Sequence, residues 1–254
     1  MIGRVLMFWK KSGNKVVAHE RAEFTKVLRD FSESIIVTIL LAVLIRECFI
    51  SAYRIPTAAM VPNLKVGDYI FALRSPFGIP IPFSRSKLNQ GRLPYRGEVV
   101  VFKCPDNKDI NCVKRVIGLP GDSIQIKSGV VYVNDLIAPQ IEYEGKELIQ
   151  DLPGAEYYQL KLEKFESTSF LILKSNNESV QGSSFGPFVV PQGQIFVLGD
   201  NRDSSDDSRI WGAIPISDIQ AKAWFIWLSL DWQKSWNSGQ LPSIRWKRIF
   251  TSVQ

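Results

Sequence analysis

An uncharged apolar run near the N-terminus limits the possible organisation of this chain more than any other feature. Residues 34–45, "SIIVTILLAVLI", carry no charge, and the apolar character extends from Phe31 to Tyr53 if three charged residues are tolerated. A membrane helix needs about 20 mostly apolar residues, whereas a run of about 10 to 14 more often forms a buried core helix. Hydropathy alone therefore leaves a membrane span and a soluble helix both open.

The charges that precede the run favour the membrane span. Seven Lys and Arg residues stand before Phe31 against three Asp and Glu residues, an excess typical of a cytoplasmic tail. We therefore expect a basic cytoplasmic tail over 1–30, a transmembrane helix over 31–53 and an extracytoplasmic domain over 54–254. A cleaved signal peptide is the rival interpretation, since "TAA" at 57–59 has the small residues of a cleavage site, but the basic region is too long and the site too distant.

Composition indicates a globular protein with no nucleic-acid partner. The chain has 254 residues, of which 45% are hydrophobic, so it can bury a substantial core. The excess of 31 Lys and Arg over 25 Asp and Glu gives a net charge of +6, which would suit a nucleic acid or an anionic membrane surface. The sequence contains no basic block outside its two ends and no nucleic-acid-binding motif, so we expect membrane lipid rather than nucleic acid as a partner.

The cysteines leave one question open. Cys104 and Cys112 bracket the polar segment "CPDNKDINC", whose ends could meet in a disulfide, but two free thiols are an equal alternative. The only histidine, His19, is far from both in the sequence, so the spacing of a metal site is absent and we expect no metal or other cofactor.

The remainder of the chain is predicted to be mostly β. Short β-branched runs are separated by Gly, Pro, Asn and Asp, without a βαβ rhythm, which indicates an antiparallel β-rich domain. "KSGV" at 127–130 predicts a hairpin turn, 83–97 an exposed basic loop, and the more polar 136–190 an inserted subdomain or a set of long loops. The predicted strands are 97–103, 111–119, 122–127, 130–134 and 193–200.

Tryptophans are concentrated at the C-terminal end. Their positions suit a surface that rests on the membrane interface, where indole rings and basic side chains are favoured. A strand with one core face and one exposed face explains each of them equally well. The five are Trp224, Trp227, Trp232, Trp236 and Trp246.

Two polar segments are candidates for chemistry. In "NCVKRVIGLPGD", strand alternation puts Lys114 and Arg115 on opposite faces, each beside apolar residues. A buried Lys has a lowered pKa and can act as a general base, whereas Arg stays charged and needs a carboxylate, although a solvated strand edge is the simpler reading. "LGDNRDSSDDSRIWG", 198–212, has the composition of an ordinary solvated loop. A calcium-binding loop is the competing interpretation, but the spacing of its carboxylates does not match an EF-hand and its Arg residues would repel a cation.

Together, these segments resemble the type I signal peptidases, which are membrane-anchored serine endopeptidases with a Ser-Lys dyad. The resemblance is carried, in the family's order, by "RIPTAAMVPNLKVGD", "GEVVVFKCP", "VKRVIGLPGD" and "GDNRDSSDDSRIWG", with "AWFIWLSLD" and "RWKRI" near the end. The resemblance spans almost the whole of 54–254. The segments taken together are specific for this family, although no single segment is.

The resemblance implies a function for each matching position. Lys114 matches the general base, Thr57 replaces a serine whose hydroxyl helps to stabilise the oxyanion, and Ser205 matches a hydroxyl that orients the base. Met60 and Pro62 match the nucleophile loop. The supporting ion pairs implied are Asp200 with Arg115 and Asp207 with Arg209.

Ala59 is the departure, because it occupies the position of the nucleophilic serine and a methyl group cannot attack a carbonyl. Thr57 is a poor substitute, since a nucleophile two residues away is misplaced by more than catalysis tolerates. Ala59 is either a substitution introduced into a working peptidase or the native residue of a pseudopeptidase that binds signal peptides or a membrane partner. A structural component without a substrate groove is a third alternative.

The resemblance also implies the setting of the reaction. The expected substrates are secreted preproteins with small residues at the first and third positions before the cleaved bond. The expected location is a bacterial-type cytoplasmic membrane, crossed once with the N-terminus in the cytoplasm, and the chain as written is expected to be inactive.

Overall fold

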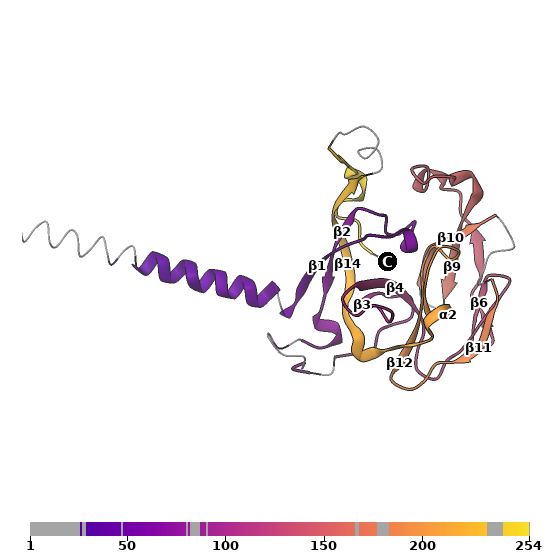
Figure 1. Cartoon of the computed structure of the whole chain (residues 1–254), viewed down its shortest axis with the longest axis horizontal. Coiled ribbons are helices and arrows are strands. Elements are labelled where there is room, and N and C mark those ends of the chain that lie inside the picture. The colour runs from indigo at the N-terminus through magenta and orange to yellow at the C-terminus, as the bar shows by residue number, and fades with distance from the viewer. Residues whose placement is uncertain are drawn as a thin grey trace, which may run out of the picture. The chain divides into compact units, whose positions relative to one another are not determined.

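The structure is a computed structural model, and it divides into two compact units, Met1–Glu47 and Cys48–Gln254 (Figure 1). The division falls shortly before the first strand, which begins at Ile50. The residues that the structure describes are 26, 29–46, 48–79, 81, 87–89, 91–165, 168–176, 183–232 and 241–253.

In the first unit, residues 29–46 form a helix whose apolar side chains are exposed, Leu40 for example to 58%. Within the described ranges, no helix combines the length and the apolar character needed to cross a membrane. The predicted boundary of the helix is wrong at its C-terminal end. Ile50–Arg54 is strand β1, whose backbone pairs with strand β2 (Asp68–Leu73), and this pairing ends the helical segment before residue 50. Most of the predicted basic tail lies outside the described residues.

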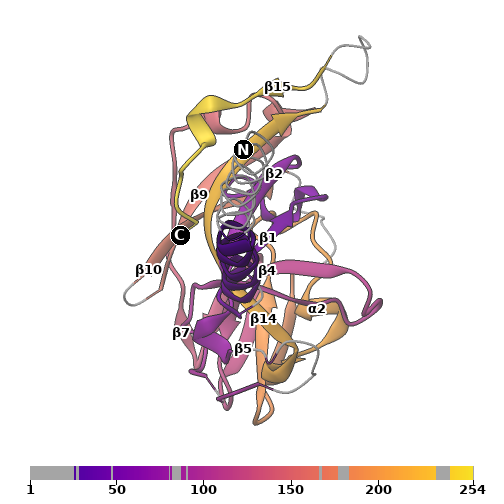
Figure 2. The ribbon, with the colours of Figure 1, turned by 90° about the vertical axis from the view of Figure 1, so that its left-hand side faces the viewer.

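The second unit is built on an antiparallel sheet of eight strands, counted over the described residues. Its order is β1-β2-β14-β3-β4-β12-β13. β15 pairs with the end of β14, and both strands are labelled in Figure 2, β15 at the top of the view. The 13-residue strand β14 pairs with both β2 and β3, so it joins the N-terminal strands to the centre of the sheet. The bounds are β3 Val99–Lys103, β4 Asn111–Gly118, β12 Gln194–Leu198, β13 Ile214–Pro215, β14 Ile219–Asp231 and β15 Ser243–Ile244.

Two smaller sheets complete this unit, with orders β11-β5-β6-β7 and β10-β9-β8. Each of the five predicted runs contains a strand, and the prediction of a hairpin at 127–130 is confirmed. Lys127 pairs with Val130 across Ser128 and Gly129, both with positive φ, as a two-residue type I′ turn requires. The bounds are β5 Ser123–Lys127, β6 Val130–Val133, β7 Leu136–Ile137, β8 Gln140–Glu142, β9 Tyr158–Phe165, β10 Thr168–Ser175 and β11 Phe185–Val189.

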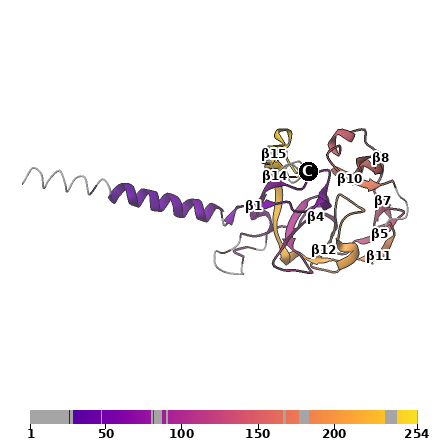
Figure 3. The ribbon, with the colours of Figure 1, turned by 45° about the horizontal axis from the view of Figure 1, so that its top comes forward.

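The segment 136–190 is more regular than its polar sequence suggested. It supplies β7 and β11 to one small sheet and all three strands of the other, and it belongs to the same compact unit as the rest of 48–254. In Figures 1 and 3, β10 and β11 lie on one side of this unit and β1 and β14 on the other, with β4 between them.

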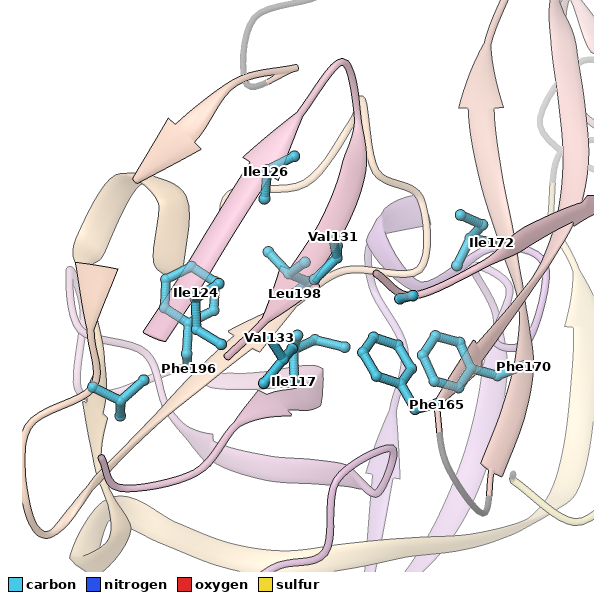
Figure 4. Close-up of a cluster of buried hydrophobic side chains, with 12 residues drawn as sticks. Ile117, Ile124, Ile126, Val131, Val133, Phe165, Phe170, Ile172, Phe196 and Leu198 are labelled. Carbon is cyan, nitrogen blue, oxygen red and sulfur yellow. The ribbon is translucent and has the colours of Figure 1, made fainter. Parts of the chain in front are cut away.

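A shared hydrophobic core joins this segment to the large sheet. In Figure 4, the rings of Phe165 and Phe170, from β9 and β10, lie side by side close to Ile117 of β4, and their centroids are 5.6 Å apart. Ile117 and Phe196 are fully buried in the same cluster. Burial of one such side chain stabilises a fold by about 1.5–3 kcal/mol, so 136–190 is integral to the domain rather than appended to it.

Candidate active site

Lys114 lies in the middle of β4 and is only 5% exposed. Its Nζ donates a hydrogen bond to the Oγ of Ser205 at 2.8 Å and lies 5.9 Å from the centre of the Trp211 ring. Burial disfavours the charged ammonium and lowers the pKa of Lys114 to about 8, although Asp207 and Asp206 act in the opposite direction. A substantial fraction of Lys114 is therefore neutral, and able to accept a proton, at mildly alkaline pH.

Arg115, the next residue, is also buried, at 1% exposure, so the solvated-edge reading of this strand is wrong. Both faces of β4 are covered. The Arg115 guanidinium donates to both carboxylate oxygens of Asp200, at 2.6 and 2.7 Å, and lies 4.0 Å from the Phe170 ring. This bidentate pair fixes the residues that follow β12 onto β4.

Asp207 holds the other end of the 199–209 segment. It is fully buried and is the N-cap of the short helix α2 (Ser208–Trp211), where it accepts a hydrogen bond from the backbone N–H of Arg209. Its carboxylate also accepts from the Arg209 guanidinium at 2.8 Å and from the backbone N–H of Gly199 at 3.0 Å. The ion pair and the cap together fold the loop so that Ser205 faces Lys114.

Gly199 marks the point where two loops converge. A Cβ atom at this position would lie 2.1 Å from the Oγ of Ser205 and 2.6 Å from the backbone oxygen of Ala59. Any side chain there would therefore push apart Ser205 and the loop that carries Ala59. The glycine lets the partner of Lys114 approach residue 59.

The 57–62 loop is held by the segment after β12. Asn201 donates its backbone N–H to the oxygen of Ala59 at 3.0 Å and its side-chain amide to the oxygen of Ala58 at 3.2 Å. Ala59 is 7% exposed within a short 3-10 helix, Ala58–Met60, and Thr57 stands exposed at the N-cap of that helix. A hydroxyl on residue 59 would thus project from a fixed backbone.

Several residues that hold the site were missed by the sequence analysis. Asn63 donates to Asp200 at 2.7 Å, and Glu163 of β9 forms a fully buried ion pair with Arg202. Asp68, also fully buried, pairs with Arg248 at 2.6 Å and so ties "KVGD" to "RWKRI". Each of these contacts joins segments far apart in the chain. The sequence shows which residues are polar or charged, but it does not show which of them form pairs.

The disulfide question is answered by the structure. Cys104 and Cys112 form a disulfide that closes the connection between β3 and β4, and Cys112 lies two residues before Lys114. Cys48 takes no part in this disulfide.

The chain is similar in sequence to a family of known proteins. The family described as signal peptidase, peptidase S26, matches residues 28–228. A signal peptidase I of Rickettsia typhi is 35% identical over 85% of this chain and 82% of its own length, and one of Pseudomonas aeruginosa is 30% identical over 83% and 76%. A crystal structure of a signal peptidase I from Enterococcus faecalis has 25% identity and a TM-score of 0.32, covering 52% of this chain and 97% of that one.

Proposed function

Because the chain belongs to the peptidase S26 family of signal peptidases, we propose that it has the frame of a signal-peptide-cleaving Ser-Lys endopeptidase that Ala59 keeps from cutting. The observation that carries this proposal is the buried Lys114 with its lowered pKa, hydrogen-bonded to Ser205 beside the backbone of residue 59. These are the parts a Ser-Lys dyad needs, except for the nucleophilic oxygen.

With serine at position 59, the resemblance to the family implies the following mechanism. Neutral Lys114 takes the hydroxyl proton as the oxygen attacks the scissile carbonyl, and the backbone N–H of residue 59 and the Thr57 hydroxyl stabilise the oxyanion. The protonated Lys114 then donates a proton to the leaving amine. The same Lys activates the water that hydrolyses the acyl-enzyme, and Ser205 keeps the amine oriented throughout.

The experiment compares lysine variants in an Ala59→Ser background, with a preprotein that carries Ala at the first and third positions before the bond. We expect Ala59→Ser to cut, Ala59→Ser with Lys114→Met to be inactive, and Ala59→Ser with Lys87→Met to keep its rate. Lys87 is a matched control because burial lowers its pKa too, while its Nζ donates to the backbone oxygen of Phe77 rather than to Ser205. Retained cutting by the Lys114→Met variant would refute the assigned base.

We also propose that residues 31–49 anchor the chain in a cytoplasmic membrane with the β domain outside. Support comes from the uncharged run 34–45, the basic residues before it and the exposed apolar side chains of the 29–46 helix. Extraction of bacterial membranes with alkaline carbonate tests this anchor. We expect the full chain to stay in the pellet, and release into the supernatant would contradict a spanning segment.

A non-cleaving binder of signal peptides is the alternative function, favoured by the alanine itself. It predicts that the chain as written binds a signal peptide, and that Ala59→Ser binds equally well but does not cut.

A further inference from the structure

A polar pocket of about 430 Å³ lies where β9 begins and β10 ends, beside the turn between β5 and β6. The side chains that border it include several that donate hydrogen bonds, namely those of Ser128, Ser183, Ser184, Gln159 and Asn176. The described residues around it include neither Lys114 nor any part of the 57–62 loop. The pocket is therefore separate from Lys114 and residue 59.

Two lysines reach this pocket from the same face of the small sheet. Lys161 of β9 pairs with Ile172 of β10, and Lys174 pairs with Gln159, so the two lysines are diagonal neighbours across the strand pair. Diagonal neighbours in an antiparallel pair are about 7–8 Å apart, which is within reach of long side chains. Both lysines border the pocket, so two positive charges are brought together there.

The charges of these lysines are not neutralised by ion pairs. Among the described residues, neither lysine pairs with a carboxylate, and the hydrogen bond that Lys174 donates to the backbone oxygen of Gly129 is long, at 3.4 Å. Asp203 is the one carboxylate among the described residues that border the pocket, and it accepts the backbone N–H of Ser175 at 2.6 Å. Two Lys against one Asp leave these side chains with a net charge of +1.

The turn between β5 and β6 fixes the wall of the pocket. Gly129 donates its backbone N–H to the oxygen of Ser183 at 2.7 Å, and its own oxygen accepts from the Gln140 amide at 3.1 Å. A Cβ atom on Gly129 would lie 2.5 Å from the Nζ of Lys174, so the glycine makes room for the ammonium group. The groups around the pocket are therefore arranged before a ligand binds, which lowers the entropic cost of binding.

An anion in the pocket would relieve an unfavourable arrangement of charge. Burial lowers the pKa of Lys174, and the charge of Lys161 lowers it further, although Asp203 acts in the opposite direction. A bound anion would favour the charged form of both ammonium groups. A phosphate group suits the site better than a carboxylate, because its oxygens can accept from both lysines and from the surrounding hydroxyl and amide groups at once.

We propose that this pocket binds a phosphate-type oxyanion between the ammonium groups of Lys161 and Lys174 and the neighbouring serine hydroxyls. The ligand is free phosphate or the phosphomonoester of a lipid headgroup, which share this chemistry. The inference is independent of the proposed function, because it involves neither Lys114 nor residue 59.

Isothermal titration calorimetry of the full chain as written, in a nonionic detergent, tests the site directly. Inorganic phosphate stands for the free ion and glycerol 3-phosphate for the headgroup ester, with sodium chloride at the same ionic strength as the background. We expect one saturable site and a Tm that rises with the phosphate ligand but not with chloride, and the tighter ligand identifies the source. The absence of both a saturable heat and a rise in Tm would overturn the proposal.

Lysine variants show whether binding occurs in this pocket. Lys161→Met and Lys174→Met each remove one charge, and each should raise the Kd of the tighter ligand about tenfold or more. Lys164→Met is the matched control and should leave Kd nearly unchanged, because Lys164 lies exposed on the opposite face of β9 and does not border the pocket. Equal Kd values for the three variants would contradict the proposal, and the titration of the unmodified chain decides even if a variant fails to fold.

Discussion

At the scale of residues, the candidate site is a set of fixed groups around the backbone of Ala59. Lys114, Ser205 and the backbone of residue 59 are each held by buried contacts, and Gly199 lets them converge. Fixed groups contribute to catalysis by positioning and electrostatics, so we expect this arrangement to accelerate cleavage only when a nucleophile is present.

The pKa of Lys114 predicts the pH dependence of the restored enzyme. Since only the neutral amine accepts a proton, kcat/KM of Ala59→Ser should rise with pH and level off above a midpoint near pH 8. Initial cleavage rates between pH 6 and 10 give the profile. A rate that falls steadily across this range would contradict Lys114 as the base.

The same pKa predicts a stability effect. Below pH 8, Lys114 is charged in both the folded and the unfolded chain, and its burial destabilises the fold. Between pH 8 and about 10.4 the folded protein has lost the proton that the unfolded chain keeps, so the free energy of unfolding should rise with pH, by about 3 kcal/mol for the full shift. Denaturant unfolding of the chain as written and of Lys114→Met should show a larger rise in the former, because Lys87 and Lys174, whose pKa is also lowered by burial, contribute equally to both. Equal slopes would count against this prediction.

Thr57 is expected to stabilise the oxyanion. In the Ala59→Ser background, Thr57→Val removes the hydroxyl but keeps the shape, so kcat should fall by about 10²–10³ with KM little changed. Thr57→Ser, which keeps a hydroxyl, is the control and should remain within a few-fold of the parent. A kcat unaffected by Thr57→Val would show that the backbone N–H acts alone.

At the scale of elements, buried ion pairs fasten the loops to the strands. Arg115 of β4 and Asp200 are each 1% exposed, so their ion pair is buried, unlike an ordinary ion pair at the protein surface. Asp200→Ala should destabilise the fold by about 3–5 kcal/mol, because it leaves a buried guanidinium unpaired. Asp218→Ala breaks the exposed pair with Lys108 and should cost less than about 1 kcal/mol. Urea unfolding of the two variants tests this, and similar losses would be inconsistent with it.

Elements whose signals are local could be predicted from the sequence. The β-branched runs that became β3 to β6 and β12, and the turn at Ser128 and Gly129, depend on neighbouring residues. Strand β1 was assigned to the helix because "ISAYR" continues the apolar run, and only its partner β2 makes it a strand. β9 and β10 each place residues in a core shared with distant strands, and no local pattern reveals these contacts.

At the scale of the whole molecule, the domain 48–254 is closed by contacts between the ends of its sequence. Asp68 accepts hydrogen bonds from Ser229 and Arg248, so the residues that follow the 57–62 loop depend on the C-terminal segment. The resemblance named Lys114, Ser205 and both ion pairs, but the burial of Glu163 with Arg202 and the pocket that Lys161 and Lys174 border came from the three-dimensional arrangement. Such pairings cannot be read from one sequence, because many charged residues could serve as partners.

The most direct test of the account is the cleavage rate of one preprotein, with Ala at the first and third positions before the bond, by the chain as written and by Ala59→Ser in the same liposomes at pH 8.5. We predict that only Ala59→Ser releases the mature protein, with a new N-terminus at that bond. Cleavage at the same bond by the chain as written, or none by either form, would contradict the claim that a competent site lacks only the hydroxyl of residue 59.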